Sequence, residues 1–132
     1  MIGIFVCVFT VDVVKDTLLT MSDKIQKCIH FILLLGSKDT PRIQKQYLIK
    51  SISKIQLSAI CELALNILRG HIPINTDQGA KLKRYRKRLR RLSNKRCTIV
   101  EKKRLFNLQL SDILLEPCVN FIKENAQSFE TL

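Results

Sequence analysis

The sequence has few of the residues from which catalytic and metal sites are usually built. It contains two histidines, His30 and His71, and neither has a cysteine or carboxylate partner at the spacing of metal ligands. It has no P-loop, dinucleotide-binding or nucleophile-elbow glycine motif, and its acidic residues are single and dispersed. We therefore expect a protein without enzymatic activity, catalytic residues, metal or cofactor.

The number and spacing of the cysteines do not fit a disulfide framework. The cysteines are odd in number, lie far apart and include no C-x-x-C pair: Cys7, Cys28, Cys61, Cys97 and Cys118. This pattern disfavours a secreted, disulfide-bonded protein and favours reduced thiols inside a cell. We expect these side chains to pack as small buried hydrophobic groups.

Glycine and proline are scarce, with four and three among 132 residues, whereas 46% of the residues are apolar. A disordered basic tail would have few apolar residues, so this composition favours a folded and helical protein. The length fits one domain with its own core. We place a single helical domain at residues 22–132.

Residues 1–21 form an apolar N-terminal extension of that domain. Its apolar run, from Ile2 to Phe9, is too short to span a bilayer, and Asp12 follows it closely. It also lacks a basic n-region and a small-residue cleavage site, which disfavours a secretory signal. The alternatives are a packed strand, the start of a helix, or a segment upstream of an internal start at Met21.

Capping and helix-stop residues from Ser22 onward predict an all-α fold, a small bundle of about five short helices. Thr40, followed by Pro41, is expected to cap the second helix, and Asn75 or Thr76 the fourth. The expected helices span residues 22–36, 40–50, 53–70 and 76–92, then a helix from Thr98, and a last helix after Ser111 and Asp112 that is interrupted at Pro117.

The clearest core helix is the third, which begins at Ser53 and ends at Gly70. Its apolar residues recur at the spacing that places them on one helical face: Leu57, Ile60, Cys61, Ala64, Ile67 and Leu68. In the following helix the apolar seam is much narrower: Leu82, Tyr85, Leu89 and Leu92. A seam that narrow predicts a helix that lies on a core with most of its circumference in solvent.

The excess positive charge of the chain is confined to residues 81–104. The formal net charge is +12, and this segment holds thirteen cations against one acid, Glu101. The cations are Lys81, Lys83, Arg84, Arg86, Lys87, Arg88, Arg90, Arg91, Lys95, Arg96, Lys102, Lys103 and Arg104. No acid lies between Lys81 and Arg91 to relieve the repulsion of the eight cations there, which favours neutralisation by a polyanion.

These thirteen residues are therefore the candidate nucleic-acid contacts. The segment is rich in lysine and arginine and has almost no other residues that contact base edges. This composition favours phosphate binding that is largely independent of sequence. We expect DNA in preference to RNA as the partner, and a nuclear or virion-associated protein, since the basic run is also typical of a nuclear localisation signal.

Other interpretations of the basic segment remain open. It could belong to a sequence-specific DNA-binding regulator, or it could dock on an acidic protein or a capsid lining. A merely solvated helical face is a further alternative. Membrane-surface binding is disfavoured, because the apolar seam has leucine and tyrosine but no tryptophan or phenylalanine.

The basic helix and the helix from Thr98 are expected to form a helix-turn-helix-like pair. Thr98 and Glu101 have the T-x-x-E spacing of a capping box, which gives the single acid of the segment a structural role. Leu105 and Leu108 would then face inward, with Phe106 as a further candidate.

Four successive segments resemble a known group of proteins: CELALNILRG, HIPI, KLKRYRKRLRRL and KRCTIVEKKRLF. Over about residues 45–106 the chain is similar to small basic proteins of Maverick/Polinton-type and adenovirus-like elements. The resemblance implies a virion-associated or genome-packaging role, with Arg84, Arg88 and Arg91 as phosphate contacts. After residue 106 the chain departs from the Gly-rich apolar tail typical of that group, so a function of that tail does not carry over.

Overall fold

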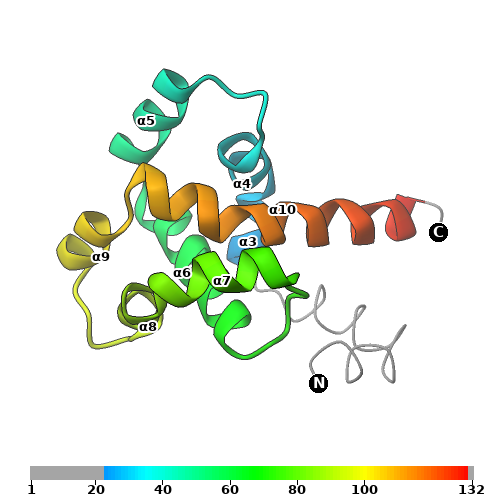
Figure 1. Cartoon of the computed structure of the whole chain (residues 1–132). Helices are drawn as coiled ribbons and strands as arrows, with labels where there is room; N and C mark the ends of the chain where they lie inside the picture. Colours follow the sequence, from blue (N-terminus) through cyan, green and yellow to red (C-terminus); the bar gives the residue numbers. More distant parts are fainter. Residues whose placement is uncertain (1–22, 131–132) are drawn as a thin grey trace.

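The computed structural model describes residues 23–130, with side chains described for residues 23–124, and the expected N-terminal extension at residues 1–21 lies outside them. The described residues form eight helices and no strand (Figure 1), which confirms the all-α prediction. The helices are α3 (Asp23–Lys27), α4 (Ile29–Gly36), α5 (Arg42–Lys50), α6 (Lys54–Leu68), α7 (Thr76–Arg84), α8 (Arg86–Ser93), α9 (Ile99–Leu105) and α10 (Leu108–Glu130).

The number of helices exceeds the expected five or so because two expected helices are each broken in two. One break lies at Cys28, where φ is near −100° and ψ near 13°. The other lies at Tyr85, where φ is near −105° and ψ near 12°. At Tyr85 the N–H donates to the carbonyl of Leu82, three residues back, 3.0 Å away. This bridge-region conformation tightens the turn and redirects the chain without glycine or proline.

The breaks let one stretch of chain pack on two different helices. α3 packs on α6 while α4 packs on α10, and α7 packs on α10 while α8 packs on α6. Figure 1 shows α10 crossing the middle of the molecule, with α5 and α9 at its periphery. The core therefore has two central helices, α6 and α10, and the two broken helices link them.

α6 confirms the predicted core helix. Ser53 and Gln56 form a capping box in which each side chain accepts from the other residue's backbone N–H. At its other end Gly70 has φ of 75°, its N–H donates to Ile67 and the N–H of His71 donates to Asn66. This is a Schellman motif, and its left-handed residue is one that glycine adopts without strain.

α10 differs from the prediction at its start and at its proline. The Oδ1 of Asn107 accepts from the N–H of Leu110 at 2.9 Å, so the helix begins before the expected Ser111 and Asp112. It then continues through Pro117, where an interruption was expected. A proline removes one helical hydrogen bond, and the long buried face of α10 outweighs this loss: Leu110, Leu114, Leu115, Cys118, Val119, Phe121 and Ile122.

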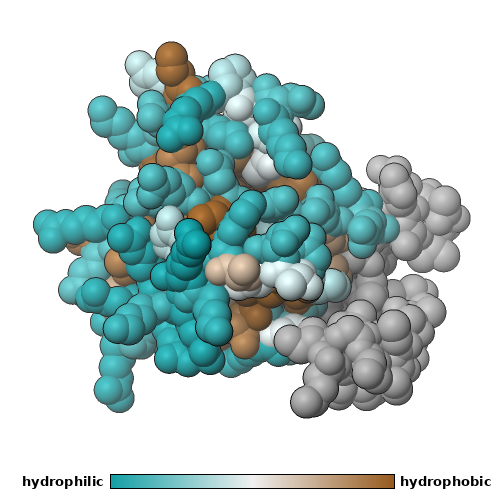
Figure 2. Space-filling model, viewed as in Figure 1, coloured by the Kyte–Doolittle hydropathy of each residue, from teal (hydrophilic) through white to brown (hydrophobic). Residues whose placement is uncertain are grey.

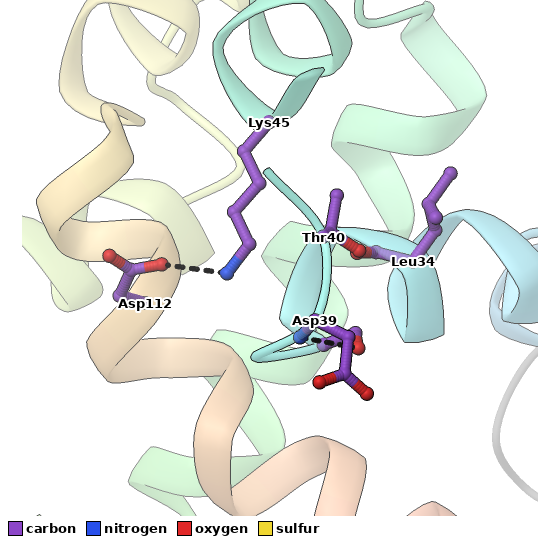
Figure 3. A network of polar contacts seen from close by, with 6 residues as sticks. Leu34, Asp39, Thr40, Lys45 and Asp112 are labelled. Atoms are coloured by element: carbon purple, nitrogen blue, oxygen red, sulfur yellow. Dashed lines mark hydrogen bonds and ion pairs between the residues drawn. The ribbon is translucent and has the colours of Figure 1, made fainter. Parts of the chain in front are cut away.

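Thr40 does not cap α5 as expected. Its Oγ1 donates to the carbonyl oxygen of Leu34 at 2.6 Å (Figure 3). Pro41 precedes the first residue of α5 without a side-chain cap. A threonine hydroxyl can donate as well as accept, and the last carbonyls of α4 lack helical donors. Thr40 therefore closes the helix before it.

Candidate nucleic-acid interface

The candidate contacts are distributed over the end of α7, all of α8, the connection at residues 94–98 and α9. Twelve of the thirteen cations are exposed, and Lys102 is the half-buried exception. Figure 2 shows hydrophilic side chains over most of the face on which α7, α8 and α9 lie. We call these thirteen residues and the backbone that carries them the basic face.

The leucines of the predicted seam hold the basic face on the core. Leu82, Leu89 and Leu92 are 5%, 1% and 0% exposed, and Tyr85 is half-buried against the same core. The seam keeps its inward direction across the break at Tyr85. Because each leucine is anchored, the cations between them are directed outward.

Glu101 forms an ion pair with the basic face. Its Oε2 lies 3.9 Å from Arg91 Nη2. Both side chains are about half exposed or more, so solvent screens this pair and it contributes little to stability. The Arg88 guanidinium also lies 5.5 Å from the ring centroid of Tyr85, a cation–π distance.

Glu101 has a structural role that differs in part from the expected capping box. Thr98 Oγ1 accepts from the Glu101 N–H at 3.2 Å, which forms one half of the box. The Glu101 carboxylate instead accepts from the Cys97 thiol at 3.1 Å and lies near Arg91. These contacts connect α8, the connection and α9.

Three of the five cysteines confirm the expectation of buried hydrophobic groups, namely Cys28, Cys61 and Cys118. Burial raises the pKa of each of these thiols. Cys97 is half-exposed, and its pKa is raised chiefly because its thiol donates to Glu101. Cys7 lies outside the described residues.

Lys102 differs from the other candidate contacts. It lies on the side of α9 that faces α6, and its charge lowers the pKa of Cys61 against the larger effect of burial. A half-buried lysine whose charge acts on a core cysteine has less access to a phosphate than its exposed neighbours. We therefore assign Lys103 and Arg104, both exposed, as the outward cations of α9.

Sequence reasoning missed two apolar residues on the basic face, Ile99 and Val100. They are 42% and 61% exposed at the start of α9. The signal was present in the sequence, because both lie four residues before a cation, Lys103 and Arg104, and so share their helical face. An outward pair of β-branched residues among cations is therefore part of the site.

Other parts of the described chain offer no comparable arrangement. A hollow of about 340 Å³ lies between the connection before α7 and α10, and is lined in part by Pro73, Gln78 and Phe121. Another of about 370 Å³ lies where Lys45 pairs with Asp112 at 3.4 Å and docks α5 on α10 (Figure 3). In the second hollow the Thr40 hydroxyl donates to Leu34 and the Lys45 ammonium pairs with Asp112, so these groups are engaged within the protein.

Within the same residues, no group of three or more histidine, cysteine or acidic side chains is placed to hold a metal ion. No single described helix is long and apolar enough to cross a membrane, and α5 with α6 meets that test only as a pair bent by 107°.

Comparison with protein-family models, curated proteins and solved structures finds no match to this chain.

Proposed function

We propose that this protein binds nucleic acid without catalysing a reaction, through the phosphates and largely independently of sequence. One observation carries the proposal: twelve exposed cations on α7, α8, the connection at residues 94–98 and α9 lie outside a buried leucine seam, and the ion pair of Arg91 with Glu101 is screened by solvent. A polyanion is the partner that relieves such a concentration of charge.

The binding mechanism is charge neutralisation. Lysine ammonium groups and arginine guanidinium groups replace condensed counterions along the phosphate backbone, and release of those ions supplies much of the affinity. Arginine also makes forked hydrogen bonds to phosphate oxygens. The helices contribute rigidity, because the seam fixes α8 on α6 and α7 on α10 before the ligand arrives.

The pair α8 and α9 supports a helix-turn-helix-like mode of binding. The two helices pack on each other and are joined by the short connection at residues 94–98. In such pairs the first helix crosses the backbone and the second enters a groove. We propose duplex DNA in preference to RNA for this reason.

The biological setting that we propose is a nucleoprotein or genome-packaging role in a virus-like element, in the nucleus or the virion. It rests on the resemblance of residues 45–106 and on the charge. Two alternatives use the same surface: a sequence-specific regulator and a module that docks on an acidic protein. Each predicts a different result in the binding experiments below.

A salt titration of binding to duplex DNA, single-stranded DNA and RNA tests the proposal. With about six to ten phosphate contacts, affinity for duplex DNA falls by a factor of about 10³ to 10⁵ between 50 and 200 mM salt. Binding that hardly depends on salt would contradict the mechanism.

Two further results separate the alternatives. Unrelated duplexes are expected to compete within a few-fold of one another, whereas one strongly preferred duplex would indicate a regulator. Partners that remain bound in a pull-down after complete nuclease digestion would indicate the protein-docking module instead.

A further inference from the structure

The outward face of α9 combines apolar and cationic groups. Ile99 and Val100 stand beside Lys103 and Arg104, because residues four apart lie on one side of a helix. All four side chains are exposed, whereas Leu105 is half-buried and Phe106, the residue after α9, is 2% exposed. Ile99 and Val100 are therefore not part of the hydrophobic core.

Phosphate binding does not use Ile99 and Val100 either. An aliphatic side chain gains nothing from an anion, and helix surfaces that only meet phosphates are served by lysine and arginine. The ligand that fits this face has apolar groups in the middle and negative charge at the edges. Lys103 and Arg104 lie one turn after the apolar pair on the same helical face, and the exposed Lys95 and Arg96 precede it in the chain, which matches that distribution of charge.

The major groove of duplex DNA has this chemistry at A·T base pairs. Each thymine presents its C5-methyl group on the groove floor, and phosphates line both edges. Duplex RNA lacks the methyl group, and its major groove is too narrow and deep for side chains to read. An apolar protein surface fits less well, because the flanking cations would be desolvated without partners.

We propose that α9 lies in the major groove of duplex DNA, with Ile99 and Val100 against thymine methyl groups and Lys103 and Arg104 on the flanking phosphates. This inference rests on the proposed function and adds a modest preference for A·T-containing duplexes to it. The packing of α9 on α8 and α6 positions its outward face for this insertion.

The test compares two duplexes that differ only in the thymine methyl. One is an A·T-rich duplex with thymidine, and the other has deoxyuridine at every thymidine. Fluorescence anisotropy at fixed salt gives the ratio of the two affinities. Wild type is expected to prefer the thymidine duplex by about fourfold, the effect of burying one methyl-sized group.

The variant Ile99→Ser/Val100→Ser is expected to bind both duplexes equally, with its helical circular dichroism unchanged. The matched control is Ile43→Ser/Tyr47→Ser, which removes two apolar residues that are 70% and 69% exposed on α5. This control is expected to keep the wild-type ratio. A control that also lost the preference would overturn the assignment to α9.

The outcomes separate this inference from the proposed function. Salt-dependent binding of wild type with equal affinity for the two duplexes would overturn the thymine contact and leave phosphate binding intact. Tighter binding to duplex RNA than to either DNA duplex would also overturn it. Absence of salt-dependent binding to any nucleic acid would end both.

Discussion

At the scale of single residues, close packing between two helices explains why position 36 is a glycine. Gly36 ends α4 as expected, but not through a left-handed backbone, since Gly70 is the glycine with positive φ among the described residues. A Cβ on Gly36 would overlap Val119 Cγ2 and lie 3.2 Å from Leu115 Cβ on α10. Gly36 is therefore needed for the close approach of α4 to α10.

Gly36→Ala is expected to lower the free energy of unfolding by about 1–3 kcal/mol, the usual cost of overpacking a core. Its matched control is Gly79→Ala in α7, where the nearest atom to a new Cβ is Ile74 Cγ2 at 3.8 Å. That substitution is expected to stabilise by about 0.4–1 kcal/mol, because the unfolded chain loses freedom. Urea denaturation measures both, and equal effects would contradict the close packing.

Cys97 and Glu101 give a prediction about pH. Donation to the carboxylate stabilises the thiol and raises the Cys97 pKa above its ordinary value of 9.0. The thiolate, which is the reactive form, therefore appears only at higher pH. Glu101→Gln removes the negative charge, so alkylation of Cys97 at pH 8 is expected to become faster.

Mass spectrometry of the tryptic peptide at residues 97–102 follows this reaction separately from the other cysteines. The buried Cys118 is expected to stay unreactive in both proteins and serves as the internal control. Slower alkylation of Cys97 in Glu101→Gln would show that the hydrogen bond does not control this thiol.

At the scale of helices, the sequence predicted the directions of side chains better than the number of elements. The caps at Ser53 and Thr98 and the stop at Gly70 are local signals, and the structure confirms them and selects Asn75 from the two expected caps of α7. The expected cap at Thr40 was wrong. The break at Tyr85 could not be predicted, because Leu82, Tyr85, Leu89 and Leu92 continue one helical period across it. The break arises because α7 packs on α10 and α8 packs on α6, and this packing is a property of the assembled core.

Leu89→Ala tests the anchoring of α8. Leu89 is 1% exposed on the face of α8 that packs on α6, so its truncation is expected to destabilise by about 2–5 kcal/mol. Arg90→Ala, at the exposed neighbouring position, is expected to change stability by no more than about 0.5 kcal/mol. A small effect of Leu89→Ala in urea denaturation would mean that the seam does not hold the basic helix.

At the scale of the whole molecule, charge and core are separated. The sequence located the excess charge fully, because charge is counted without knowledge of the fold. It could not place Lys102 beside Cys61 or leave Ile99 and Val100 outside, because both depend on how α9 rests on α6 and α8. Resemblance and charge alone indicated phosphate binding, whereas the outward apolar pair on α9 supports the groove contact.

The central claim is that cations of the basic face, and not net charge in general, contact phosphates. Arg84→Gln/Arg86→Gln/Arg90→Gln removes three exposed guanidinium groups from α7 and α8. The control Lys38→Gln/Lys50→Gln/Lys123→Gln removes the same charge from exposed positions elsewhere. Both variants are compared with wild type in one measurement, the slope of log affinity for duplex DNA against log salt concentration.

The account predicts that the arginine variant loses about 0.9 of slope for each lost contact, about 2.7 in all, while the lysine control keeps the wild-type slope. Equal slopes for the two variants would contradict it.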